Sequence, residues 1–279
     1  MIVTKPLIIA VAPNGARLTK ADHPALPITP RELGLEAARC REAGAAMIHL
    51  HVRDAEERHS LDLDRYRAAI AAVRREAGPE MIVQVTTESV GLYAPAEQIA
   101  AIRGLRPEAF SVAVRELFAE PDDEGAAAAF LAEQARAGTL VQHILYDAGD
   151  VTRFQGLVAR GLIPLERASV LFVLGRYSAG QRSEPADLLP FLAAWNSGHH
   201  LDLPWALCAF GRQEAACLIT ASCLGGDVRV GFENNLWRPD GSLAPDNATQ
   251  VAAIASLAAR LGLEIATPTI ARTLLSARR

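Results

Sequence analysis

Two histidines, His49 and His51, stand two residues apart in a stretch where apolar and polar residues alternate, residues 47–53. This alternation predicts a β-strand, on which side chains two positions apart point to the same face. Each imidazole could then give one nitrogen to a single metal ion, because histidine is a common metal ligand. The alternative is a histidine pair that is hydrogen-bonded inside a polar strand end. The pattern marks these two residues as the first candidates for a metal site.

A second polar pair lies at the end of a predicted strand, residues 227–232. Arg229 and Glu233 fall on one face of the alternating pattern and are expected to point inward. They could form a structural salt bridge, although burying charges without a function is costly. Together with His49 and His51, Glu233 would make a set of two nitrogens and one oxygen with a fourth position left open. That set is typical of catalytic rather than structural zinc sites.

The chemistry that such a set predicts follows from the properties of a bound divalent metal. The ion can polarise a carbonyl oxygen as a Lewis acid, or it can activate a water molecule. The planar guanidinium of Arg229 matches a carboxylate. Arginine beside a metal therefore favours a substrate that carries a carboxylate close to a ketone.

The elements that must position these residues form a regular series. Eight β-rich runs are predicted at residues 7–13, 47–53, 81–87, 109–116, 140–146, 168–174, 204–210 and 227–232. The clearest helical stretches are residues 30–43, 62–76, 121–137, 185–195, 213–223 and 244–261. Pro30 and Pro185 suit first helical turns, and Gly44 and Gly262 suit the ends of helices.

This alternation, with no break in composition, predicts a single-domain α/β fold over residues 1–279, a (β/α)₈ TIM barrel. A doubly wound open sheet is the alternative, but it usually has fewer strands and a glycine-rich first loop, which residues 13–15 do not provide. In a TIM barrel, catalytic groups lie at the carboxyl ends of the strands. The polar ends of the predicted strands agree with that placement.

Composition narrows the classes of protein. The formal net charge is −4 with charges of both signs mixed, which indicates no nucleic-acid partner and no basic membrane surface. No apolar run is long enough for a membrane span, and the N-terminus does not resemble a secretory signal. The four cysteines show no paired spacing and are expected to stay reduced. We therefore expect a cytoplasmic protein. Of the other histidines, His143 is expected in the core, whereas loop positions facing solvent are expected for His23, His59, His199 and His200.

Nearly the whole chain resembles the family of β-keto acid cleavage enzymes. The most specific segments are His-x-His-x-Arg-Asp at residues 49–54 and Gly-Gly-Asp-Val-Arg-Val-Gly-Phe-Glu-Asn-Asn at residues 225–235. Further matching segments are residues 14–16, 19–20, 27–30, 44–46, 146–149 and 210–212.

The resemblance implies a TIM barrel, usually a homotetramer, with Zn²⁺ on His49, His51 and Glu233. It also implies an acyltransferase reaction in which a β-keto acid and acetyl-CoA give acetoacetate and a new acyl-CoA. Zinc and the catalytic Arg229 would hold the keto acid while the carbon between its two carbonyls loses a proton. Substrate contacts are expected from Asn14, Arg17, Thr86 and Ser89.

The chain departs from the family pattern at residue 234, where Asn234 stands in place of an aspartate that resembles a general base. An amide cannot accept a proton near neutral pH, so another carboxylate or a metal-bound hydroxide must do so if the chemistry is kept. Glu88, Glu116 and Asp147 lie near strand ends and are candidates, although such carboxylates are more often paired or solvated.

Two further departures concern specificity. Arg17 stands where family members that take an amine-bearing keto acid have glutamate. The reversed charge favours an anionic or polar neutral substrate tail, unless Arg17 is only a solvated loop residue. Residues 87–89 replace a Thr-Gly-Gly loop, which predicts a pocket of different shape.

Other functions fit parts of the pattern. A zinc hydrolase or lyase on the same barrel is the first alternative, and a non-catalytic metabolite-binding protein is the second. Amidohydrolase-type barrels also use His-x-His, but on the first strand and with further histidines. Here the pair lies on the second predicted strand and the sixth has no histidine, which argues against that class.

Overall fold

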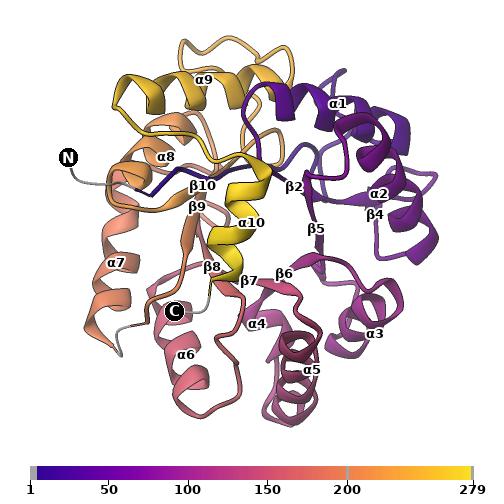
Figure 1. The fold of residues 1–279 in the computed structure, drawn as a ribbon, viewed down its shortest axis with the longest axis vertical. Coiled ribbons are helices and arrows are strands. Elements are labelled where there is room, and N and C mark those ends of the chain that lie inside the picture. The colour runs from indigo at the N-terminus through magenta and orange to yellow at the C-terminus, as the bar shows by residue number, and fades with distance from the viewer. Residues whose placement is uncertain (1–4, 199–200, 278–279) are drawn as a thin grey trace.

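In the computed structural model, which describes residues 5–198 and 201–277, eight parallel strands close into a barrel (Figure 1). The barrel order is β1-β10-β9-β8-β7-β6-β5-β2, so the predicted TIM barrel is confirmed. The barrel strands are β1 Ile9–Val11, β2 Met47–Leu50, β5 Ile82–Thr86, β6 Ala109–Ala113, β7 Leu140–Leu145, β8 Ala168–Leu174, β9 Trp205–Ala209 and β10 Asp227–Val230. A short antiparallel pair, β3 Val52–Arg53 and β4 His59–Ser60, stands beside the barrel.

Helices surround the barrel, and all six predicted helical stretches are found with ends shifted by a few residues (Figure 1). They and the additional helices are α1 Pro30–Glu42, α2 Leu63–Ala77, α3 Pro95–Leu105, α4 Val114–Leu117, η1 Pro121–Asp123, α5 Glu124–Ala137, α6 Ala148–Ala159, η2 Pro185–Asp187, α7 Leu188–Ser197, α8 Glu214–Cys223, α9 Asn247–Arg260 and α10 Pro268–Ser276. Helix α1 begins where the sequence indicates, because Thr29 and Glu32 form a capping box before Pro30. Within the described ranges, no helix is long and apolar enough to cross a membrane.

Helix α10 lies across one end of the barrel, which it closes (Figure 1). Its residues Ala271 and Leu275 pack with the apolar side chains that point inward at the first positions of the strands, including Met47 and Ile82. This end of the barrel is therefore apolar and sealed. Chemistry is left to the other end, where the strands carry polar residues inward.

The barrel interior becomes polar toward the carboxyl ends of β2, β5 and β10. His49, Gln84 and Arg229 are all buried, and each is the third residue of its strand. The outward residues, such as Ile48 and Val85, belong to the layer that packs against the helices. The alternation in the sequence therefore assigns these faces correctly.

Seven of the eight predicted strands end one to three residues earlier than expected, and three of these ends bear on the site. The strand predicted at residues 47–53 is interrupted after Leu50, because Val52 and Arg53 leave the barrel to pair with β4. The strand predicted at residues 109–116 ends at Ala113, and the short helix α4 follows. The strand predicted at residues 227–232 ends at Val230, where Gly231 adopts a φ of 137° and turns the chain.

Candidate metal centre and substrate cavity

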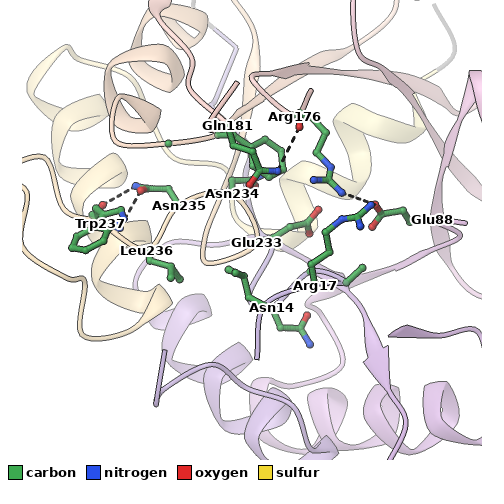
Figure 2. Close-up of a pocket in the computed structure, with 16 residues that line it drawn as sticks. Asn14, Arg17, Glu88, Arg176, Gln181, Glu233, Asn234, Asn235, Leu236 and Trp237 are labelled. Atoms are coloured by element: carbon green, nitrogen blue, oxygen red, sulfur yellow. Dashed lines mark hydrogen bonds and ion pairs between the residues drawn. The ribbon is translucent and has the colours of Figure 1, made fainter. Parts of the chain in front are cut away.

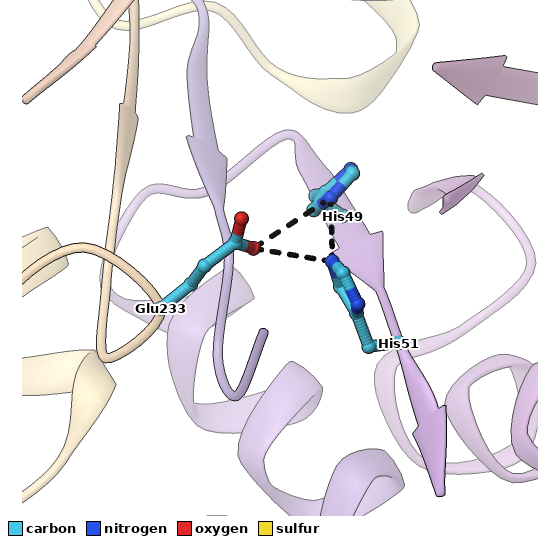
Figure 3. Close-up of side chains that lie close together, drawn as sticks. All are labelled: His49, His51 and Glu233. Atoms are coloured by element: carbon cyan, nitrogen blue, oxygen red, sulfur yellow. Dashed lines mark hydrogen bonds and ion pairs between the residues drawn. The ribbon is translucent and has the colours of Figure 1, made fainter. Parts of the chain in front are cut away.

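The structure brings His49, His51 and Glu233 together at the carboxyl end of the barrel (Figure 3). Both histidines are buried, and their Nε2 atoms are 3.0 Å apart. The Oε2 atom of Glu233 lies 3.6 Å from Nε2 of His49 and 3.4 Å from Nε2 of His51. Two nitrogens and one oxygen therefore face a common point, as the spacing of the histidines predicts.

A hydrogen bond fixes which nitrogen of His49 faces this point. Its Nδ1 lies 2.8 Å from the Oε1 atom of Gln84 on the neighbouring strand. An amide oxygen only accepts, so Nδ1 carries the hydrogen and Nε2 keeps a free lone pair. Burial, with a further contribution from Arg229, lowers the pKa of His49 to about 3. The imidazole is therefore neutral near pH 7, which is the form that binds a metal.

Glu233 reaches the site from the turn after β10, not from the strand as the alternation suggests. The turn is held because Glu233 N–H donates to the carbonyl of Ala12 at 3.0 Å and Phe232 N–H donates to Asn247 at 2.8 Å. A side chain at Gly231 would place a Cβ 2.6 Å from the Ala12 carbonyl. Only glycine fits there, so the turn that aims Glu233 depends on residue 231.

Arg229 points into the barrel as expected and pairs with Glu233. Its Nη2 donates to Oε1 of Glu233 at 3.0 Å and to Sγ of Cys208 at 3.3 Å. Burial raises the pKa of Glu233, but the charge of Arg229 lowers it by more, so its pKa lies well below the usual range. A structural salt bridge alone does not account for this carboxylate, because its buried Oε2 has no hydrogen-bond partner. That oxygen is the one that faces the two histidines.

The donor set fits a metal ion. Zinc binds nitrogen and oxygen at about 2.0–2.1 Å, so neighbouring donors around a tetrahedral ion lie about 3.3 Å apart. The three separations here are within about 0.3 Å of that spacing. The two Nε2 atoms, which face each other, and the unpartnered Oε2 are the atoms that an ion would satisfy.

Two adjoining cavities lead to the three donors. The inner cavity is lined by the donors together with Thr86, Tyr146 and Arg229, and its volume is about 20 Å³. The outer cavity has a volume of about 230 Å³, and its lining includes Asn14, Arg17, Gln181, Asn234, Leu236 and Trp237. Since one water needs roughly 10–15 Å³, the inner cavity has room for about one small group. An organic substrate must therefore occupy mainly the outer cavity.

The residues predicted to touch a substrate divide into two sets. Asn14, Arg17 and Thr86 line the cavities, and Asn14 also donates to the backbone carbonyl of His51 at 3.2 Å. Ser89 lines neither cavity, and its N–H donates to Glu116 at 2.9 Å. Asn234 lines the outer cavity, is 5% exposed, and has no hydrogen-bond partner on either side-chain atom.

Arg176 lines both cavities, and Figure 2 shows it at the outer one. It was not among the residues predicted from the sequence. Its guanidinium lies 5.4 Å from the ring centroid of Phe210 and 3.3 Å from Glu88. The signal was present in the sequence, because Arg176 follows the predicted strand 168–174 by two residues. A polar residue just beyond a barrel strand is a candidate for the active site.

Two of the three candidate bases line neither cavity. The carboxylate of Glu116 accepts from Ser89 N–H and from Gln98 Nε2, and burial raises its pKa. Asp147 pairs with Arg115 at 2.7 Å and caps helix α6. Glu88, in contrast, lines both cavities.

The expectation that His23 and His59 face solvent was wrong, because both are buried. His23 packs on the ring of Phe232 and bonds to the carbonyl of Ala244, and His59 lies against His51 and bonds to the carbonyl of Glu88. His143 is buried against Phe154, as expected for a core residue. His199 and His200 lie outside the described residues.

A Gly15→Ala substitution is expected to weaken metal binding by about ten- to a hundredfold, as loss of a supporting contact does. Gly15 has a φ of 57°, and an added Cβ would lie 2.6 Å from Cγ of Glu233, so the carboxylate must move. The metal content after dialysis against graded chelator measures the effect. Gly161→Ala is the matched control, because Gly161 has a φ of 73° with nothing within 4 Å of an added Cβ. Equal metal affinity in the two variants would contradict the prediction.

Comparison with known proteins agrees with this geometry. A family model described as beta-keto acid cleavage enzyme matches residues 6–276. The chain is 32% identical over 277 residues to 3-keto-5-aminohexanoate cleavage enzyme of Fusobacterium nucleatum subsp. nucleatum, with 97% of each chain covered. It is 30% identical over 283 residues to 3-oxoadipate:acetyl-CoA acetyltransferase of Cupriavidus necator, covering 98% of this chain and 95% of the relative.

Among solved structures, the apo structure of ObcA shares the fold with a TM-score of 0.71 at 20% identity. That match covers 90% of this chain, which spans 65% of the length of the ObcA chain. The match of the family model over nearly the whole chain is the more specific result. The chain therefore belongs to the family of β-keto acid cleavage enzymes.

Proposed function

We propose that this protein is a zinc-dependent acyltransferase that converts a β-keto acid and acetyl-CoA to acetoacetate and a new acyl-CoA. The observation that carries the proposal is the set of His49, His51 and Glu233 beside the inward Arg229. Two relatives named for acetyl-CoA-dependent transfer or for keto acid cleavage support it. Both are similar to this chain along almost their whole length.

Each part of the site has a task in this reaction. When bound, zinc supplies a Lewis acid that lowers the energy of an enolate. Arg229 offers its guanidinium to the carboxylate or to the developing enolate oxygen, in a buried place where water does not compete. The carbon between the two carbonyls then attacks the acetyl thioester and expels CoA thiolate. The thiolate attacks the original ketone carbon of the condensed product, and the carbon–carbon bond beside it breaks. The new acyl-CoA leaves, and the acetoacetate enolate takes back the proton removed at the start. Ile144 and Val173 give the inner cavity an apolar wall, which favours the release of water when a substrate enters.

The preferred substrate tail is anionic. Arg17 lines the outer cavity and Arg176 lines both cavities. Glu88 is the single carboxylate paired with both arginines within the described ranges (Figure 2). Two guanidinium groups beside one carboxylate leave positive charge to offer a second carboxylate. A β-keto dicarboxylate fits this arrangement, and the Cupriavidus necator relative is named for one.

The test is to incubate the zinc-loaded protein with acetyl-CoA and β-keto acids that have acidic, neutral or cationic tails. Acetoacetate and the matching acyl-CoA, detected by mass spectrometry, are expected with the acidic tails. Cleavage products that form without consumption of acetyl-CoA would indicate a hydrolase or lyase instead. Binding of the keto acids without any product would indicate a metabolite-binding protein.

Charge reversal at Arg17 is expected to lower kcat/KM for a β-keto dicarboxylate by about three- to tenfold. The effect is modest because the side chain is 57% exposed, so water screens its charge. Steady-state kinetics with acidic and neutral tails measure the change in selectivity. Arg31→Glu is the control, because it makes the same charge change at the exposed first turn of α1, where glutamate suits the helix dipole. Equal losses in Arg17→Glu and Arg31→Glu would show that Arg17 is only a solvated loop residue.

A further inference from the structure

One carboxylate that lines the substrate cavities, that of Glu88, is not among the candidate metal ligands. The carboxylates that line the inner cavity, among the described residues, are those of Glu233 and Glu88. Glu233 is already committed, because one of its oxygens pairs with Arg229 and the other faces the two histidines. Glu88 lines the outer cavity as well, so it stands where a substrate would pass from one cavity to the other.

The backbone around Glu88 is fixed on both sides. Its N–H donates to the hydroxyl of Thr86 at 3.0 Å, and its carbonyl lies 2.8 Å from Nε2 of His59. His59 in turn packs against His51, with ring centroids 5.3 Å apart. The Glu88 side chain is only 15% exposed. A loop residue would ordinarily be free to turn to solvent, but these contacts keep Glu88 at the cavity wall.

Both ion pairs of Glu88 use the same oxygen. Nη2 of Arg176 lies 3.3 Å from Oε1 of Glu88, and Nη2 of Arg17 lies 3.9 Å from that same atom. In Figure 2 the two arginines approach Glu88 from the side of the outer cavity. The second oxygen, Oε2, takes part in neither ion pair. It is therefore available to accept a proton.

Four other candidate side chains are unsuited to that task. Asn234 carries an amide, which does not accept a proton near neutral pH. Glu116 and Asp147 are bound to other residues and line neither cavity. Tyr146 lines the inner cavity, but burial raises the pKa of its hydroxyl well above the usual range, so it stays protonated.

We propose that Glu88 is the general base of this enzyme, an inference that rests on the proposed cleavage of β-keto acids. Oε2 of Glu88 takes a proton from the carbon between the two carbonyls of the keto acid. The C–H bond breaks, an O–H bond forms on Glu88, and the electron pair remains on the substrate as an enolate, beside Arg229. An anionic tail competes with Glu88 for Arg17 and Arg176 and so draws the two guanidinium groups toward the substrate.

Proton exchange isolates this step from the rest of the reaction. Zinc-loaded protein is incubated with 3-oxoadipate in D₂O without acetyl-CoA, and deuterium at the carbon between the two carbonyls is followed by mass spectrometry. A sample without protein corrects for spontaneous exchange. Glu88→Gln is expected to slow enzymatic exchange at saturating keto acid by about 10²–10⁴-fold, the usual contribution of a general base. Its zinc content is expected to stay unchanged.

One further variant tests whether Glu88 acts by accepting a proton, and a second serves as its control. Added formate is expected to restore exchange in Glu88→Ala, because a small carboxylate can occupy the space that the substitution leaves. Asp147→Asn is the matched control, since Asp147 lies outside the cavities and asparagine also caps a helix. It is expected to exchange at the wild-type rate.

The outcomes distinguish this inference from the function on which it rests. Wild-type exchange in Glu88→Gln, or a loss in Glu88→Ala that formate does not restore, would overturn the role of Glu88 and leave the proposed function standing. Absence of both exchange and acetoacetate in the zinc-loaded wild type, across the panel of keto acids, would overturn the proposed function and the role of Glu88 with it.

Discussion

A Glu233→Gln variant is expected to bind zinc far more weakly than the wild type and, as a result, to lose at least about a thousandfold in kcat. Glu233 supplies the one anionic donor among three, and a neutral amide is a much weaker ligand for a divalent cation. A catalytic metal stabilises transition-state charge by several kcal/mol, and each 1.36 kcal/mol corresponds to a factor of ten in rate. Metal content by mass spectrometry and kcat for acetoacetate formation check the prediction together.

The same substitution has a second consequence, because it leaves Arg229 buried without its carboxylate. Breaking a buried ion pair on one side costs about 3–5 kcal/mol of unfolding free energy. Glu233→Asp is therefore the companion variant, since it keeps the charge beside Arg229 but draws the carboxylate back from the histidines. It is expected to fold more stably than Glu233→Gln while still binding metal weakly. Full metal occupancy in either variant would show that Glu233 is not a ligand.

An Arg229→Met variant is expected to lower kcat/KM for the keto acid by about ten- to a hundredfold. Hydrogen bonds to charged groups are worth about 1.5–3 kcal/mol, and Arg229 lies where water cannot replace it. Arg229→Lys should recover only part of the loss, because an ammonium lacks the planar fork that matches a carboxylate. Steady-state kinetics of the two zinc-loaded variants measure these effects.

The stability of the Arg229 variants tests whether its pair with Glu233 is only structural. In Arg229→Met the Glu233 carboxylate loses its nearest cation, and a bound metal would compensate for that loss. We therefore expect the variant to be destabilised more without zinc than with it, as thermal unfolding with and without chelator would show. If lysine restores full activity and zinc has no effect on stability, the pair is a structural bridge with no role in binding.

Much of the fold could be predicted from the sequence, because the relevant signals are local. The alternation around His49 and around Arg229 identifies the inward faces of two strands, since successive side chains on a strand point to opposite sides. The capping residues Thr29 and Glu32 mark the start of α1 for the same local reason. Helix α10, in contrast, follows α9 with no strand between them, so the repeating strand–helix pattern gave no reason to expect it. Its role in closing the barrel follows only from packing against the first residues of the strands.

The sequence by itself determined that His49, His51 and Glu233 belong on the same side of a barrel. The tertiary structure decided what depends on contacts between distant segments: the turn at Gly231 that aims Glu233, and the burial of His23 and His59. It also placed Glu88 and Arg176, 88 residues apart in the chain, against each other at the junction of the cavities. Such contacts are set by barrel closure, which brings the ends of separate strands together, and no local pattern encodes their distances.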